Sequence, residues 1–483
     1  MTDQAPFSRV AVLGGGISGL AAAHRLANSG KPVEVTVFET ALAPGGLVRT
    51  EHRDGFLIEC GPDSFITNKP AGLELCKDLG VEDQLIPTCS RWRRSLVLHG
   101  GRPCDVPEGF MLMAPGKLSA VLATPILSWP GKLRLLSEYF VRRRRSSGDE
   151  SLEDFVVRRF GSEVFERLVQ PLVGGIYTAD PRRLSLSATL PRFIQMEQKY
   201  GSIIRAMQKQ KRREKNGAAD EATAGSGARY GLFATHRDGL GALVQACEES
   251  CLASGRVTIR YGQRIGSIRP CEDSGCRWHL RVRGESESRQ FDAIIGTLPT
   301  YRMAAVMPDP RFVDFRCRLE QFEYASSAIV VTAHKLADFR HPLDAFGLVI
   351  PECERRRILA VSFSSRKFEG RAPEDSVLLR TFVGGAMHPE LLDRDDGELE
   401  KLVCDELRDL LGLQAEPQFA MTVRYNKAMP QYHVGHEERV RTLHADLEQF
   451  PGLFLAGSAY SGVGLPDSIG SARQAADKAI AAL

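Results

Sequence analysis

The sequence predicts a mixed α/β (α+β) protein with more than one domain. Three observations predict this class: a strand–turn–helix–strand pattern opens the chain, a helical pattern covers 117–198, and strand patterns recur between 257 and 384. The 483 residues, 43% of them hydrophobic and 25% charged, have the composition of a globular protein. A chain of this length is too long for one compact core, so we expect two or three domains that are discontinuous in sequence.

The first predicted unit runs from the apolar strand Arg9–Leu13 through a glycine-rich turn into a helix that ends near Asn28. A second apolar strand follows at Val33–Phe38. Two strands joined through a helix are parallel neighbours, because a parallel pair needs a crossover connection. The opening therefore predicts a β-α-β unit in a parallel, Rossmann-like sheet.

The turn between the first strand and the helix carries Gly14-x-Gly16-x-x-Gly19. The first glycine permits the tight turn, the second lets the backbone approach a pyrophosphate, and the third allows close packing of helix on strand. The helix N-terminus favours phosphate through its free N–H groups and its dipole. Glu39 ends the second strand twenty residues after Gly19, where an acid bonds a ribose hydroxyl. Strand, turn, helix and acid together predict a dinucleotide site rather than an empty glycine turn.

Two more glycine turns follow in the first 65 residues. Gly45-Gly46 precedes Arg49 and could wrap a second loop around the same pyrophosphate, although the pair alone would be an ordinary turn. The stretch "ECGPDSF" at 59–65 supplies a further tight turn with exposed backbone. Placed behind Glu39, these turns resemble the FAD site of the flavin amine oxidase superfamily, and this resemblance favours FAD over NAD.

The C-terminal end repeats the opening arrangement. The apolar strand "LFLAG" at 453–457 leads through a glycine-bearing turn into an alanine-rich helix. Pro466 suits the first helical turn and Asp467 suits the positive end of the helix dipole. The chain therefore builds a glycine-rich helix start near each of its ends.

The strand and helix patterns suggest how the domains are divided along the chain. Strands are predicted at Val257–Tyr261, Ile265–Ile268, Trp278–Val282 and Phe291–Thr297, and again in "SSAIVVTA" and "SVLLRTFVGG". We expect an FAD-binding Rossmann-like domain from 1–85, 231–300 and 416–483, and a β-sheet substrate-binding domain from 86–116, 199–214 and 301–415. The remainder is a helical domain at 117–198 and a small, polar, glycine-rich insertion at 215–230.

Charge and cysteine content limit the classes of function. The net charge of +3 gives no general case for nucleic-acid binding. The eleven cysteines show no metal-ligand spacing, so we expect reduced thiols in a reducing compartment and no metal site. We expect a cytoplasmic protein, since no secretory signal or apolar run long enough to cross a membrane is apparent. The stretch "PILSWPGKLRLLSEYFVRRRR" combines apolar residues with a basic end, which suits either a peripheral membrane contact or domain packing.

The glycine turns resemble those of the flavin amine oxidase superfamily, and further motifs narrow the resemblance. "PLVGGIYTADPRRLSLSATLP", "MPQYHVGH" and "GVGLPDSIGSA" together resemble oxygen-dependent protoporphyrinogen and coproporphyrinogen oxidases. The similarity runs from Val10 to Ala476 apart from an insertion at Lys209–Tyr230. It implies FAD as cofactor, with the two glycine-rich helix starts holding the two ends of one FAD molecule.

The resemblance assigns site residues where the motifs align. The cofactor-binding set is Gly14, Gly15, Gly16, Ile17, Ser18, Gly19, Glu39, Thr40, Gly46, Leu47, Arg49, Gly61, Pro62, Asp63, Ser64, Ile265, Tyr425, Gly457, Val463, Gly464 and Leu465. The substrate-binding set is Arg94, facing a propionate, with Phe346, Gly347, Val349 and Phe382 beside the tetrapyrrole. Ordinary core packing explains the two phenylalanines equally well, and Arg94 could instead be a surface arginine. Tyr425 departs from the family, where a tryptophan often stands before "PQY", and Ser468 stands where a cysteine is frequent.

The resemblance implies a six-electron oxidation of a porphyrinogen to a porphyrin in haem biosynthesis, with O2 reduced to H2O2. Protoporphyrinogen IX is the favoured substrate. The alternatives are coproporphyrinogen III, another reaction of the superfamily (amine oxidase or desaturase), and an FAD-binding protein without catalysis. No residue is predicted as catalytic, because the flavin carries the chemistry. Further candidate partners are a membrane surface, a downstream ferrochelatase and a second copy of the chain, and no nucleic acid is expected.

Overall fold

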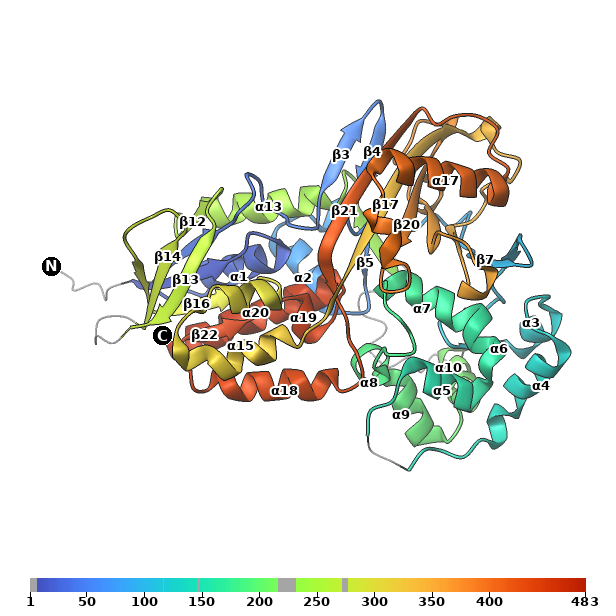
Figure 1. Cartoon of the computed structure of the whole chain (residues 1–483), viewed down its shortest axis with the longest axis horizontal. Coiled ribbons are helices and arrows are strands. Elements are labelled where there is room, and N and C mark those ends of the chain that lie inside the picture. The colour runs from blue at the N-terminus through green and yellow to red at the C-terminus, as the bar shows by residue number, and fades with distance from the viewer. Residues whose placement is uncertain (1–6, 116, 146–147, 216–231, 272–276) are drawn as a thin grey trace.

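The computed structural model describes residues 7–115, 117–145, 148–215, 232–271 and 277–483. The predicted insertion at 215–230 lies outside the described residues except for its first position. Figure 1 shows three parts: a parallel sheet with its helices at the left, a large, mostly antiparallel sheet at the upper right, and a group of helices at the lower right.

A five-stranded parallel sheet forms the first part, in the order β12-β2-β1-β16-β22. Its strands are β1 (Ser8–Leu13), β2 (Val33–Phe38), β12 (Val257–Arg260), β16 (Ala293–Gly296) and β22 (Leu453–Leu455). The order confirms the predicted β-α-β unit, because β1 pairs with β2 in parallel register through helix α1 (Ile17–Ala27). The order also places β22, which lies near the C-terminus, two positions from β1.

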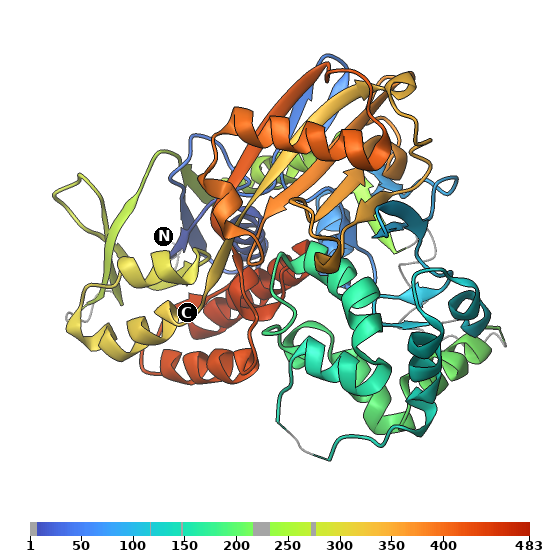
Figure 2. The same cartoon turned by 45° about the vertical axis from the view of Figure 1, so that its right-hand side comes forward.

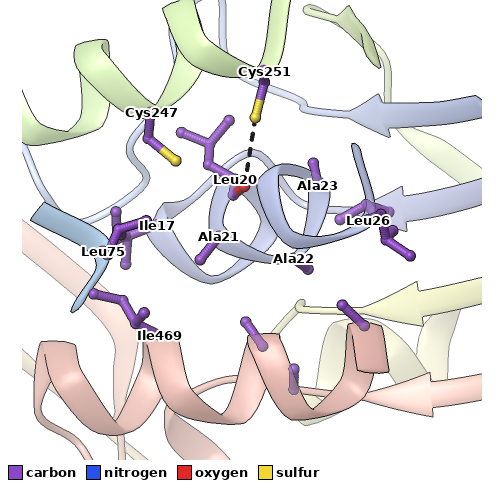
Figure 3. Close-up of a cluster of buried hydrophobic side chains, with 14 of the residues drawn as sticks. Ile17, Leu20, Ala21, Ala22, Ala23, Leu26, Leu75, Cys247, Cys251 and Ile469 are labelled. Carbon is purple, nitrogen blue, oxygen red and sulfur yellow. Dashed lines mark hydrogen bonds between the residues drawn. The ribbon is translucent and has the colours of Figure 1, made fainter. Parts of the chain in front are cut away.

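Helix α1 lies between two other helices in the core of this part. Figure 3 shows α1 packed against α13 (Leu240–Ala253) and α20 (Leu465–Ala482), with α2 (Pro70–Asp78) completing the layer. Ala21, Ala22 and Ala23 are fully buried, and their small side chains allow the helices to approach closely. The Cys251 thiol donates a hydrogen bond to the Leu20 carbonyl at 3.6 Å, which joins α13 to α1.

The other face of the parallel sheet carries a mixed layer. An antiparallel sheet of β13 (Ile265–Pro270), β14 (Trp278–Val282) and β15 (Arg289–Phe291) packs there with α14 (Thr300–Ala305), α15 (Val313–Glu320) and α18 (His436–Leu447). Cys271, in the connection after β13, is disulfide-bonded, so the prediction that all the cysteines are reduced is wrong at this position. The backbone N–H of Cys271 donates to the Arg277 carbonyl at 2.8 Å, at the ends of the connection between β13 and β14.

A seven-stranded sheet forms the second part, in the order β21-β17-β20-β19-β18-β7-β8. Its strands are β7 (Leu96–His99), β8 (Arg102–Asp105), β17 (Tyr324–Lys335), β18 (Gly347–Val349), β19 (Ala360–Phe363), β20 (Ser376–Gly384) and β21 (Phe419–Pro430). Helix α17 (Asp396–Leu411) covers one face (Figures 1 and 2). The other face packs on the hairpin of β3 (Thr50–Arg53) and β4 (Phe56–Glu59), which belongs to the nucleotide-binding part.

The third part is a group of short helices around one apolar core. They are α3 (Leu118–Ala123), α4 (Trp129–Leu136), α5 (Leu152–Phe160), α6 (Ser162–Val164), α7 (Gln170–Tyr177), α8 (Leu186–Thr189), α9 (Pro191–Tyr200) and α10 (Ile203–Lys215). A buried ion pair between Arg159 and Glu138 ties them together. Glu138 also accepts the N–H of Ile203 at 2.8 Å, which satisfies a free donor at the start of α10.

Short strands complete the chain. They are β5 (Phe65–Ile66), β6 (Leu85–Pro87) and β11 (Phe233–His236) in one sheet, and β9 (Phe110–Met111) with β10 (Ala114–Pro115) in another. Three expected domain boundaries differ from the packing. α14 and α15, placed almost entirely by the sequence in the substrate-binding part, pack in the layer on the parallel sheet. α10, grouped by its sequence position with the substrate-binding part, packs in the helical core through Ile203 and Ile204. β21, placed by the sequence in the FAD-binding part, pairs with β17 along the large sheet.

Candidate active site

The first glycine turn has the geometry that its sequence predicts. Gly14 adopts φ 108°, a conformation that favours glycine, and its N–H donates to the Phe38 carbonyl at 2.8 Å. A Cβ atom on Gly19 would lie 1.8 Å from the Gly14 carbonyl oxygen, so only glycine fits there. The turn and the first residues of α1 are therefore held close together, with the α1 N-terminus behind them.

Glu39 lies beside this turn at the end of β2. Its two carboxylate oxygens accept from the N–H of Gly15 at 2.6 Å and the N–H of Ala41 at 2.8 Å. The Glu39 carbonyl accepts from Gln263 N–H at 2.8 Å, which brings the segment leading to Ile265 next to the acid. Thr40 follows as an exposed residue.

The second glycine turn lies directly against the first. Gly45 N–H donates to the Gly15 carbonyl at 2.9 Å, and Gly45 forms a parallel bridge with Gly16. Gly46 adopts φ 61°, and a Cβ atom there would lie 3.3 Å from the Gly16 Cα. Two glycine turns thus present their backbones side by side, as a site for a pyrophosphate requires.

The third turn, 61–64, lies against the second. A Cβ atom on Gly61 would stand 1.8 Å from the Leu47 carbonyl oxygen, so glycine is required by space rather than by its φ. Arg49 is bonded to the same segment, because its carbonyl accepts from Cys60 N–H at 2.8 Å. Tyr425 reaches this turn from β21 and donates its hydroxyl to the Cys60 carbonyl at 2.5 Å.

The C-terminal turn meets the N-terminal one. A Cβ atom on Gly457 would lie 3.9 Å from the Ser18 Oγ, in the first turn of α1. Gly464 precedes α20, and Pro466 stands in the first turn of that helix. Val463 packs against the core of the helical part, whereas Leu465 packs against the core around α1. The segment 457–465 therefore lies where the nucleotide-binding and helical parts meet.

Sequence reasoning missed a buried charge cluster that holds the third turn to the large sheet. Asp63 is paired with Lys367 at 2.9 Å and with Arg380 at 3.3 Å, and Arg380 also donates to the Gly61 carbonyl. Burial alone would raise the pKa of Asp63, but the two cations outweigh it and hold that pKa well below its ordinary value. The signal in the sequence was Arg380 itself, a charged residue within the apolar strand "SVLLRTFVGG".

The predicted substrate residues fall into two groups. Val349, Ala360 and Phe382 are register partners across β18, β19 and β20, so they form one row on the sheet. Phe382 packs with the cluster that includes the β3–β4 hairpin, and Val349 packs with the helical core. Gly347 shares this face two residues from Val349. Phe346 lies just before β18, partly exposed.

Arg94 stands apart from this row. Its Nε donates to the Asp344 carbonyl at 2.9 Å, and its guanidinium forms ion pairs with the carboxylates of Asp105 and Asp344. Its contact with the predicted wall is through backbone, since Arg94 O accepts from Phe346 N–H at 2.8 Å. The propionate contact expected for Arg94 stays a prediction, and in this structure two carboxylates already occupy its guanidinium.

Two tyrosines, from the motifs that resemble porphyrinogen oxidases, lie where the helical part meets the C-terminal turn. Tyr432 of "PQY" donates its hydroxyl to the Ser458 carbonyl, and Gly462 N–H bonds that hydroxyl. Tyr177 of "GGIY" lies at the end of α7, and its hydroxyl donates to the Thr189 carbonyl at 3.3 Å. Burial and then the charge of Asp467 raise the pKa of Tyr177 to about 12, so this hydroxyl keeps its proton near neutral pH.

Comparison with known proteins supports the assignment of these turns to a flavin site. The model of the family described as flavin containing amine oxidoreductase matches residues 17–480. The coproporphyrinogen III oxidase of Staphylococcus aureus is 31% identical and covers 98% of this chain and 99% of its own length. The coproporphyrinogen III oxidase of Propionibacterium freudenreichii subsp. freudenreichii is 34% identical over 97% and 90%. Protoporphyrinogen oxidase 2 of Arabidopsis thaliana is 29% identical over 98% and 94%.

Solved structures share the fold. A protein of Exiguobacterium sp. 255-15, provisionally assigned as a protoporphyrinogen oxidase, superposes with a TM-score of 0.83 at 28% identity and covers 98% of both chains. Cyclohexylamine oxidase of Brevibacterium oxydans has a TM-score of 0.66 at 17% identity, over 98% of this chain and 99% of its own, which shows the fold alone.

The chain belongs to the flavin-containing amine oxidoreductase family, and it is a flavin-dependent oxidase. Its residues fit FAD as the cofactor. Backbone turns at 14–19, 45–46 and 61–64 converge in space, and the segment 457–465 approaches them from the C-terminal end. An added Cβ atom would lie 2.7 Å or less from a neighbouring atom at Gly14, Gly19, Gly45 and Gly61, so these turns keep their backbones close together, as the cradle of a dinucleotide demands.

Proposed function

We propose that this chain oxidises a porphyrinogen to a porphyrin, with O2 as electron acceptor, in haem biosynthesis. The likeness to enzymes named for coproporphyrinogen and protoporphyrinogen carries the proposal, because it extends over at least 97% of this chain. The row of Val349, Ala360 and Phe382 supports it, since a line of apolar side chains suits a large, flat tetrapyrrole better than a small amine.

In this proposal the residues of the chain bind and orient, and FAD supplies the two-electron chemistry when bound. The turns at 14–19 and 45–46 hold the pyrophosphate, and Glu39 holds the ribose. The turns at 61–64 and 457–465 would hold the flavin end, where the N-terminus of α20 would favour negative charge. The face that carries Phe382 orients the tetrapyrrole, and α7 closes over that face because Gly175 lies against Ala360.

No side chain is assigned as a base. Burial raises the pKa of Tyr177 and of Tyr432, so both hydroxyls stay protonated near neutral pH. Burial lowers the pKa of His436 to about 4, so the imidazole nearest to Tyr432 is neutral. These side chains can orient the substrate and exclude water.

The test is porphyrin fluorescence after the purified, yellow protein is mixed with each porphyrinogen separately in air, beside a matched mixture without protein. We expect porphyrin to appear faster than in the control, with H2O2 formed alongside it. Turnover of an amine without turnover of either porphyrinogen would replace the proposal by an amine oxidase activity. Bound flavin that no substrate reduces would indicate a binding protein.

The proposal extends to the surroundings of the enzyme. Among the described residues, no helix is both long and apolar enough to cross a membrane. Helix α4 instead exposes Trp129 (68%) and Leu133 (65%) on one face, and Phe140 (85%) follows before the basic run 142–145. We propose that this apolar face with its basic neighbour touches an anionic membrane surface. A ferrochelatase that takes up the porphyrin and a homodimer stay predictions.

A further inference from the structure

We propose that Arg192, on α9, binds a carboxylate of the substrate and favours coproporphyrinogen, a tetracarboxylate, over the dicarboxylate protoporphyrinogen. This inference rests on the proposed porphyrinogen oxidation. It assigns a specificity-determining residue at the junction of the helical part and the C-terminal turn. The sequence favoured protoporphyrinogen, so the proposal reverses that preference.

The guanidinium of Arg192 has no acceptor among the described residues. Its Nε is buried without a hydrogen-bond partner, and the side chain forms no ion pair there. Its nearest aromatic contact is with its neighbour Phe193, whose ring centre lies 4.7 Å from the guanidinium carbon. A partly buried cation without an anion is costly, and a carboxylate arriving with the substrate would remove that cost.

The missing acceptor is best judged against the other arginines whose pKa is lowered by burial. Burial lowers the pKa of four described arginines, Arg192, Arg366, Arg371 and Arg439. Arg371 donates to the carbonyls of 236 and 237, and Arg439 donates to those of 433 and 434. Arg192 and Arg366 donate to no described residue.

Arg192 lies beside the residues of the proposed site. The Tyr177 hydroxyl donates to the Thr189 carbonyl at 3.3 Å, which brings the start of α9 close to Tyr177. The charges of Arg192 and of Asp467, in the first turn of α20, act in opposite directions on the pKa of Tyr177. Asp467 does not neutralise Arg192, because Lys69 pairs with that carboxylate at 2.6 Å. The α7 helix that carries Tyr177 packs on the substrate row through Gly175. A cation without an acceptor among the described residues therefore lies close to the helix that packs on this face.

Arg366 marks a second, separate position. It lies on α16 (Ser364–Lys367), with its guanidinium carbon 5.1 Å from the Trp92 ring centre. Its charged neighbours include Arg91 and Asp344. The two propionates of protoporphyrinogen are adjacent on the macrocycle, whereas the four of coproporphyrinogen are spread around it. Two guanidinium groups on different helices, α9 and α16, that donate to no described residue would suit the more acidic substrate.

The experiment compares the holoenzyme with its Arg192→Gln and Arg192→Lys variants. Arg205→Gln is the matched control, because Arg205 is an exposed arginine in the same helical part. Binding of the two products, coproporphyrin III and protoporphyrin IX, is measured by fluorescence, and kcat/KM is measured with both porphyrinogens. We expect Arg192→Gln to weaken coproporphyrin III binding, and to lower kcat/KM for coproporphyrinogen, roughly tenfold or more. Protoporphyrin IX binding and kcat/KM for protoporphyrinogen should change about twofold at most. Arg192→Lys should recover part of the loss, and bound flavin should stay unchanged.

Equal weakening of both porphyrins by Arg192→Gln, or behaviour like that of Arg205→Gln, would overturn the inference. The two proposals fail in different ways. A wild-type protein that oxidises neither porphyrinogen contradicts the proposed function, whatever the variants do. If the wild type and Arg192→Gln oxidise both porphyrinogens equally well, only the specificity role of Arg192 is contradicted. If Arg192→Gln loses flavin, the comparison of Arg192→Lys with the wild type on the two porphyrins decides.

Discussion

The backbone at Gly61 passes so close to Leu47 that an added Cβ atom would lie 1.8 Å from the Leu47 carbonyl oxygen. Gly61→Ala must therefore move the turn at 61–64 away from the second glycine turn. We expect a loss of FAD affinity of roughly tenfold or more and a lower melting temperature, measured by flavin release and thermal unfolding. Gly397→Ala is the control, because the nearest atom to its added Cβ would be 3.5 Å away. Equal flavin retention in the two variants would contradict the assignment of the turn at 61–64 to the FAD site.

His436 is a buried imidazole whose nitrogens have no partner among the described residues. Its ring stacks on Tyr432 at 4.1 Å, and burial lowers its pKa to about 4. Because the folded pKa lies below the unfolded value of about 6.5, the unfolded chain binds the proton more readily. Its contribution to stability is complete above pH 6.5 and is lost as the pH falls towards 4.

We expect the free energy of unfolding to fall between pH 6.5 and 5, by about 2 kcal/mol for this histidine. His334 is equally buried, and its pKa is likewise lowered to about 4, so it adds to the same loss. Denaturant unfolding at pH 7 and pH 5 measures the change. His436→Phe keeps an aromatic ring in the stack and should flatten this pH dependence, and an unchanged slope in that variant would argue against it.

Strand β20 is joined to the turn at 61–64 through the charges of Asp63, Arg380 and Lys367. Asp63→Asn would leave Arg380, which is 2% exposed, without its anion. We expect a loss of about 3 kcal/mol in the free energy of unfolding and weaker flavin retention, measured by denaturant unfolding and flavin release. Asp375→Asn removes an ion pair between exposed side chains, with Lys335, and should change little. Similar behaviour of the two variants would show that the buried cluster does not hold the turn.

The elements that the sequence predicted well are those specified by neighbouring residues. The strand, glycine turn and helix at 8–27 depend on local apolar patterns and on glycines that must approach the backbone, so their signal is local. The bond from Arg380 to Gly61 joins residues 319 positions apart, and no local pattern contains it. For the same reason the positions of α10 and β21 in the sequence did not indicate the cores into which these elements pack.

At the scale of the whole molecule, the candidate site lies where the three parts meet. The nucleotide-binding part contributes its glycine turns, the large sheet contributes the row around Phe382, and the helical part contributes Tyr177 and Arg192. Figure 2 shows the helical part below the large sheet and beside the C-terminal helix. A site built at such a junction needs all three parts in register, so substitutions that loosen the helical part should lower substrate affinity before they release flavin.

The helical part also carries the proposed membrane surface, at the edge of the molecule away from both termini (Figure 1). We expect the protein to co-sediment with vesicles that contain anionic lipid, and less with neutral vesicles or at high salt. Trp129→Ser with Leu133→Ser removes two exposed apolar side chains of α4 and should lower binding roughly tenfold. The control pair is Leu252→Ser with Val313→Ser, which lies on other exposed helices at 48% and 53% exposure. Co-sedimentation that ignores both anionic lipid and the α4 substitutions would mean that this face packs against protein instead.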